Sequence, residues 1–150
     1  MANQPDPKFP TFSALYTHLL TLPPPLLPPG KATSPTLTSS IAALSLHPTL
    51  ETAFHILNND LPSAHFLVRH MQSPPAYEGM FLHGILHRIE GDYDNARAWY
   101  GNVSASDVFT KTWPGGKDEA LGFIARVEGL KKDGDGGDAG GAGETEFGGD

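Results

Sequence analysis

The chain has 150 residues, no cysteine and a formal net charge of −7. The length allows one ordinary domain, and the lack of cysteine excludes disulfides, thiolate metal sites and a cysteine nucleophile. Six of the seventeen acids lie between residues 133 and 150, which leaves eleven acids against ten Lys and Arg. Because the rest of the chain is nearly neutral and has no basic stripe, we expect no nucleic-acid partner.

The N-terminal stretch MANQPDPKFP has no apolar signal-peptide core. The chain also has no apolar run long enough to cross a bilayer. These two features predict a cytoplasmic protein that does not use a membrane as its partner.

Two helices separated by a proline-rich arm are expected before the centre of the chain. Thr11–Leu22 places apolar residues at helical spacing. Pro23–Pro29 reads PPPLLPP, which forbids helix and predicts an extended, polyproline-like arm that packs on the surface as a stiff spacer. Thr36–Leu46 is again helical in pattern. His47 precedes a proline and marks a break, and Pro48 is well suited to open the next helix.

From His55 onward the chain repeats itself with an offset of 32 residues. His55–Met71 aligns with His87–Val103, so that Asp60 meets Asp92 at the start of the second helix of each copy. An aspartate in this place accepts hydrogen bonds from the free amide groups of a helix start. A period in the thirties is typical of helical-hairpin repeats.

Small residues in the second copy fit a close helical hairpin. Gly84, in the helix expected over Tyr77–Glu90, and Ala96, in the helix after it, lack bulk where two helices would touch. Gly91 suits a left-handed cap between them. This pattern, over about residues 49–103, resembles the tetratricopeptide repeat, which implies stacked hairpins that bind a protein or peptide. The run HxxxHRxEGDxxNAxxW also resembles an uncharacterised family of small bacterial and fungal proteins, which implies no chemistry.

The predicted fold is therefore all-α, with helical-hairpin repeats flanked by N-terminal and C-terminal helices. Residues 1–132 would form a single domain, and residues 133–150, which are mostly Gly and acidic, are expected to be disordered. A flanking helix is expected over Lys117–Leu130. Its inward positions would be Leu121, Ile124, Val127 and Leu130.

The first functional hypothesis is an interaction module without enzymatic activity. Its groove would take a partner helix or an extended peptide. The side chains expected to face this partner are Tyr77, Phe81 and Arg88. Arg88 next to His87 is also suited to bind a small anionic ligand, or it forms an ion pair with a neighbouring carboxylate.

The second hypothesis is a small metal-binding protein, or a metal-dependent enzyme. His83, His87 and Glu90 are spaced i, i+4 and i+7, so they share one helix face. Two histidines and a carboxylate suit a divalent transition metal, either zinc or non-haem iron. His55 or His65 is the expected source of a further ligand. The competing interpretation makes the two helix-face histidines polar members of a helix interface, bonded to carboxylates or backbone.

Other enzyme classes have no support in the sequence. No glycine-rich phosphate loop follows a strand pattern, and no serine elbow is present, which excludes kinase, nucleotide-dehydrogenase and hydrolase motifs. Three aromatic residues at helical spacing are predicted to lie in the core: Phe66, Trp99 and Tyr100.

Overall fold

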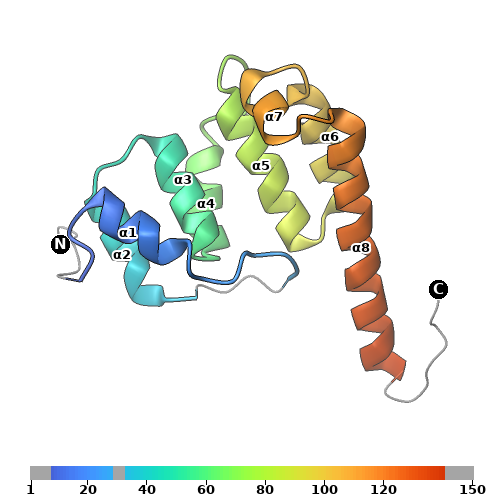
Figure 1. Cartoon of the computed structure of the whole chain (residues 1–150), viewed down its shortest axis with the longest axis horizontal. Coiled ribbons are helices and arrows are strands. Elements are labelled where there is room, and N and C mark those ends of the chain that lie inside the picture. Colours follow the sequence, from blue (N-terminus) through green and yellow to red (C-terminus); the bar gives the residue numbers. More distant parts are fainter. Residues whose placement is uncertain (1–7, 29–32, 141–150) are drawn as a thin grey trace.

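The computed structural model describes residues 8–28 and 33–140, and these ranges contain eight helices and no strand (Figure 1). The all-α prediction is confirmed. Pro29, the last residue of the predicted arm, and residues 141–150 lie outside the described residues. The helices are α1 (Phe12–Leu19), α2 (Pro35–Ala43), α3 (Pro48–Leu57), α4 (Leu61–Val68), α5 (Tyr77–Glu90), α6 (Tyr93–Val103), α7 (Asp107–Thr112) and α8 (Lys117–Gly140).

Helices α3 and α4 form one hairpin, α5 and α6 form a second, and the two turns are built alike. Each turn has a left-handed residue, Asn59 with φ 56° in the first and Gly91 with φ 87° in the second. In each turn the backbone amide of the following residue donates to the carbonyl oxygen five residues earlier, at 2.8 Å. The amide of Asp60 donates to His55 in the first turn, and that of Asp92 donates to His87 in the second. This arrangement is a Schellman cap. The 32-residue repeat seen in the sequence is therefore a repeat of backbone geometry.

The aspartates that start the second helices behave differently. Asp60 accepts from the backbone amide of Ser63 at 3.4 Å and so caps α4. Asp92 occupies the same place before α6, but its side chain accepts from the side-chain amide of Asn95 at 3.0 Å and not from a backbone amide of the helix start. The predicted cap is thus confirmed in the first hairpin and wrong in the second.

The second hairpin is packed too closely for a side chain at Gly84. A Cβ atom built there would lie 2.9 Å from the Cβ of Trp99 and 2.9 Å from the ring of Tyr100. Ala96, on the facing helix, has no exposed surface. These contacts confirm that small residues were needed where α5 meets α6.

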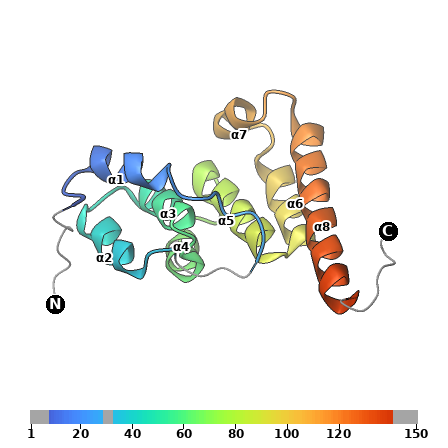
Figure 2. The same cartoon turned by 60° about the horizontal axis from the view of Figure 1, so that its bottom comes forward.

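Three clusters of buried apolar side chains run along the row of helices. The first joins α1, α2 and α3, the second joins α3, α4 and α5, and the third joins α5 to α8. The N-terminal and C-terminal helices therefore complete the core on either side of the two hairpins, as expected, and Figure 2 shows this order of the helices. The largest fully buried side chains include Leu15, Ile41, Val68, Tyr100, Phe109 and Ile124.

The last helix packs on α6 through Ile124 and Val127, and both are buried. Leu121 is half-buried, and Leu130 is 52% exposed, so the prediction that Leu130 faces the core is wrong. The reason is that the C-terminal part of α8 extends past the other helices (Figure 1). The helix continues to Gly140, which is beyond the boundary at residue 133 where disorder was expected.

The proline-rich arm runs without helix from the end of α1 across to the C-terminal end of α5 (Figures 1 and 2). It packs on the surface, as the sequence predicts, and its contacts are given below. No helix among the described residues is both long enough and apolar enough to span a membrane.

Candidate functional site

Four of the five predicted metal ligands come together on α4 and α5. The ring centroids of His83 and His87 are 4.8 Å apart, and the rings are nearly parallel, at 19°. His65, from α4, approaches each of these rings edge-on at 5.7 Å. Its Nε2 lies 2.8 Å from Oε2 of Glu90. We call these four residues the histidine cluster.

The histidine cluster is not arranged as a metal site. Within the described part of the chain, no three His, Asp or Glu side chains are placed to hold one metal ion. Glu90 is engaged by His65, and the stacked rings of His83 and His87 lie in nearly parallel planes. Ring nitrogens bind a metal in the plane of the ring, so nitrogens of stacked rings do not point at a common centre.

The packing around His83 favours a helix interface. Its ring stacks on Trp99 of α6, with centroids 4.5 Å apart and planes at 28°. Trp99 is half-buried, so it forms a stacking surface for a histidine and is not a full core residue as predicted. The signal for this contact was present in the sequence, because His83 adjoins Gly84, the residue at which α5 and α6 approach most closely.

Burial is the main cause that lowers the pKa of His83, to about 4. The neighbouring rings of His87 and His65 lower the pKa further, and Glu90 raises it in part. The buried Nδ1 of His83 has no hydrogen-bond partner in the structure. The folded protein therefore favours the neutral form of this ring.

Acid is expected to destabilise the protein through His83. The unfolded chain binds a proton at this residue near pH 6.5, whereas the folded chain does so only near pH 4. Stability is therefore full above pH 6.5 and falls as the pH drops from 6.5 to 4. The full shift is worth about 3 kcal/mol, which solvent around the partly exposed ring reduces to about 1–2 kcal/mol.

Urea unfolding of the unmodified protein and of His83→Phe at pH 7.5 and pH 4.5 measures this effect. Phenylalanine keeps a ring against Trp99 and removes the titrating group. The stability lost between the two pH values is expected to be about 1–2 kcal/mol smaller in the variant. Equal losses in the two proteins would show that His83 does not contribute.

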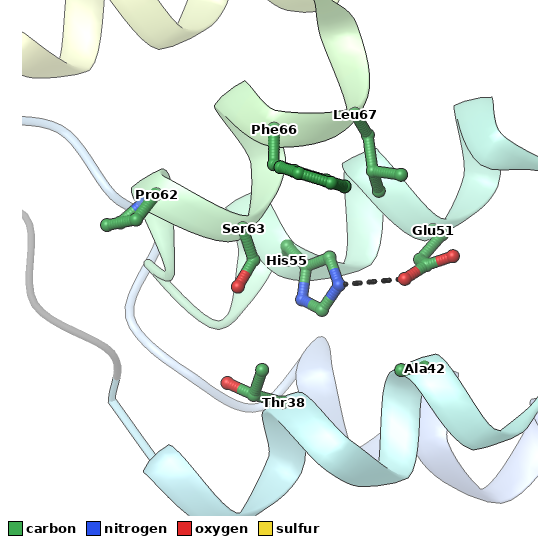
Figure 3. Close-up of a pocket in the computed structure, with 8 residues that line it drawn as sticks. All are labelled: Thr38, Ala42, Glu51, His55, Pro62, Ser63, Phe66 and Leu67. Carbon is green, nitrogen blue, oxygen red and sulfur yellow. Dashed lines mark hydrogen bonds and ion pairs between the residues drawn. The ribbon is translucent and has the colours of Figure 1, made fainter. Parts of the chain in front are cut away.

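His55 does not join the histidine cluster, although it aligns with His87. It is 2% exposed on α3. Its Nε2 is 3.2 Å from Oε2 of Glu51, and its Nδ1 is 3.9 Å from Oδ2 of Asp60. The ring is thus placed between two carboxylates, and it lines a different site, which we call the His55 pocket (Figure 3). The residues that line this pocket are Thr38, Ala42, Glu51, His55, Pro62, Ser63, Phe66 and Leu67.

Asp60 joins α2 to α4 at the edge of this pocket. Its Oδ2 accepts from the hydroxyls of Thr38 on α2 and Ser63 on α4, each at 2.6 Å. Burial by itself raises the pKa of Asp60. The hydrogen bonds from Ser63 and Thr38 and the nearby ring of His55 together lower it by more, so the net pKa lies below its ordinary value. The sequence indicated the cap on α4, but nothing in it indicated the bond to α2.

The residues predicted to face a partner have different environments. Phe81 is 4% exposed and packs against Tyr100 and Phe109, so its ring is not offered to a partner. Tyr77 is 36% exposed at the start of α5. Arg88 is 7% exposed, and its Nη1 donates to the carbonyl oxygen of Leu26 in the arm at 3.2 Å. One guanidinium nitrogen thus donates to the chain itself, whereas the buried Nε has no hydrogen-bond partner in the structure.

The arm and α8 form a second hollow, which sequence reasoning missed. The guanidinium carbon of Arg88 lies 5.2 Å from the ring centroid of Phe123 on α8. Leu26 and Phe123 both border a cavity of about 440 Å³. We call this cavity and the arm contact the arm groove. Its lining residues are Leu26, Phe123, Arg126, Val127, Gly129, Leu130 and Asp133.

The chain matches no known family model, no curated protein and no solved structure.

Proposed function

We propose that this protein is an interaction module without enzymatic activity, and that its arm groove binds an extended, apolar peptide that contains proline. The observation that carries the proposal is that the chain's own arm lies there in this form. Arg88 donates to the carbonyl of Leu26, and a Cβ atom on Gly91 would lie 3.6 Å from Pro28. The arm thus contacts α5 and its cap through two residues, Leu26 and Pro28, in the manner of a peptide held within the same chain.

The chemistry of the groove suits such a segment. Proline has no backbone N–H, so an extended proline-rich peptide offers carbonyl oxygens as its main hydrogen-bonding groups. A buried arginine is a donor without acceptor capacity and matches those carbonyls. Phe123 and Val127 supply apolar surface for the side chains between the prolines.

The arm leaves part of the groove open. Leu26 is 36% exposed and Leu130 is 52% exposed, and both border the cavity of about 440 Å³. Apolar surface that stays open beside a bound segment is typical of an interaction site. A partner peptide with larger side chains than the arm would bury more of this surface, which is how it would displace the arm.

The tetratricopeptide-like nature of the hairpins is part of this proposal, and the equal turns 32 residues apart support it. The histidine cluster supports the alternative, metal binding, less well, because Glu90 already bonds His65 and the rings of His83 and His87 are stacked. A peptide-binding module needs neither a metal nor a reaction.

Peptide binding is measured by fluorescence anisotropy with a labelled peptide of sequence TLPPPLLP, which is residues 21–28. In the unmodified protein the tethered arm competes at an effective concentration on the order of 1 mM. Replacing Leu26 and Leu27 by serine weakens this competitor. The double variant is therefore expected to bind the peptide about 10-fold more tightly than the unmodified protein does.

Two exposed leucines provide a test substitution inside the groove and a matched control outside it. In the double variant, Leu130→Ser removes apolar surface from the groove and is expected to weaken peptide binding several-fold, to an extent consistent with about 1 kcal/mol. Leu50→Ser, at a leucine of α3 that is 45% exposed outside the groove, is expected to leave binding unchanged. Equal effects of the two substitutions, or no binding to the double variant, would contradict the proposal.

A further inference from the structure

The His55 pocket shares no lining residue with the arm groove. It lies between α2, α3 and α4 and has a volume of about 370 Å³, within the range of small-molecule pockets. Its apolar wall consists of Ala42, Pro62, Phe66 and Leu67 (Figure 3). Phe66, predicted to be a core residue, is in fact 58% exposed. It borders the pocket, and the guanidinium of Arg69 lies over its ring at 4.0 Å.

The polar wall of the pocket accepts hydrogen bonds and does not offer them. The hydroxyl protons of Thr38 and Ser63 are both donated to Asp60, so these oxygens keep only lone pairs for a ligand. Nε2 of His55 is engaged with Oε2 of Glu51. Neither Lys nor Arg is among the eight lining residues. A ligand that donates protons and carries positive charge therefore fits this wall, and an anion does not.

A buried imidazole ring lies between two carboxylates in this wall. His55 is 2% exposed and Figure 3 shows its ring between α2 and α4 with one nitrogen directed to Glu51. Its other nitrogen, Nδ1, is buried without a hydrogen bond. The two carboxylates lie at opposite nitrogens of the ring, so they do not converge on one point as metal ligands would.

Glu51 is the carboxylate that a ligand would meet. Its side chain is 20% exposed, whereas that of Asp60 is 11% exposed and already accepts three hydrogen bonds. His55 binds Oε2 of Glu51 and thereby fixes the position of the carboxylate. A charge-assisted hydrogen bond to a carboxylate held in this way is stronger than a neutral one.

We propose that the His55 pocket binds a primary ammonium group on an alkyl chain, with Glu51 as its counter-ion and His55 as the residue that positions Glu51. The alkyl chain would lie on Leu67 and Phe66, which line the same pocket. A lysine side chain and a small aliphatic amine share this chemistry.

The test is an NMR titration of the full chain with n-butylammonium and with n-butanol, which has the same alkyl chain and no charge. Butylammonium is expected to shift the amide signals of pocket residues with a Kd on the order of 1 mM, as suits a ligand of so few atoms. Butanol is expected to bind at least about 10-fold more weakly. Equal affinity of the two would overturn the proposal, because the pocket would then recognise only the alkyl chain.

Substitution of Glu51 tests the counter-ion. Glu51→Gln is expected to weaken butylammonium binding about 10-fold and to leave butanol binding as it was. The matched control is Glu78→Gln, because Glu78 is also a first-turn carboxylate, on α5. Unchanged butylammonium binding in Glu51→Gln would overturn the proposal. If this variant fails to fold, the comparison of butylammonium with butanol on the unmodified protein still tests the proposal. Nα-acetyl-lysine amide as a third ligand distinguishes a peptide lysine, which it imitates, from a free amine.

Discussion

Gly84→Val is expected to lower the free energy of unfolding by about 3 kcal/mol, near the upper end of what overpacking costs. The reason is steric. A Cβ atom at this position lies 2.9 Å from both the Cβ of Trp99 and the ring of Tyr100, and Tyr100 is 2% exposed and held on its other side by Phe109. The Cβ of Trp99 is attached to the backbone of α6 and the ring of Tyr100 is buried, so α5 and α6 must separate. Urea unfolding followed by circular dichroism measures the loss.

Gly101→Val is the control, because Gly101 is a helical glycine of the same hairpin with no atom within 4 Å of the place of its Cβ. Valine and glycine differ by only a few tenths of a kcal/mol in helix propensity, so the variant is expected to unfold within about 0.5 kcal/mol of the unmodified protein. A Gly84→Val variant as stable as Gly101→Val would mean that the helices are not in close contact.

Asp60→Ala is expected to cost about 3 kcal/mol at pH 7. The side chain is buried and accepts three hydrogen bonds, two from the hydroxyls of Thr38 and Ser63 and one from the amide that starts α4. Its loss removes a helix cap, typically about 1 kcal/mol, and leaves two part-buried hydroxyls without their acceptor, at about 1 kcal/mol or more each. Thermal and urea unfolding report the change.

Asp92→Ala is the matched control from the second hairpin. The side chain of Asp92 is 51% exposed and does not cap its helix, so the expected loss is within about 0.5 kcal/mol.

Acid provides a second control. Because the pKa of Asp60 is lowered on folding, its stabilisation is full above pH 3.8 and is lost as the pH falls through the folded pKa. The difference in free energy of unfolding between the unmodified protein and Asp60→Ala should therefore become smaller below pH 3.8. A difference of the same size at low pH, or equal losses in the two alanine variants, would contradict this role of Asp60.

Local signals in the sequence were sufficient to predict the two hairpins and the other helices of the described residues, except α7, for which no helix was expected. Pro48 opens α3, Gly91 ends α5 in a left-handed conformation, and Gly84 marks the closest approach of two helices. Each of these features depends on residues within one turn or one hairpin. Leu130 was placed wrongly because periodicity gives the apolar face of a helix but not where its neighbours end.

The contacts that define the candidate sites join residues far apart in the sequence. Arg88 and Leu26 are 62 residues apart, and Thr38 and Asp60 are 22 apart. His65 and Glu90 are 25 apart, and their bond uses the carboxylate that the metal hypothesis required. A single sequence carries no periodic signal for such pairs, because each depends on how separate helices pack.

The same limit explains why His55 and His87 differ. They occupy equivalent positions, and the backbone carbonyl of each accepts the same turn hydrogen bond at 2.8 Å. Beside His55, α2 adds Thr38 to the Asp60 network, whereas beside His87 the carboxylate of Asp92 is largely exposed. Repetition of the backbone therefore does not repeat the chemistry of the side chains.

We expect the arm groove to hold the arm as an extended segment that a partner peptide can replace. Paramagnetic broadening tests it most directly, and the lack of cysteine allows a single spin label at Leu27→Cys. The label is expected to broaden the amide signals of residues 123–130 on α8, and excess TLPPPLLP peptide is expected to restore them. Two results would contradict this. In the first, the α8 signals are as sharp with the label as without it. In the second, they stay broadened at peptide concentrations that saturate the double serine variant.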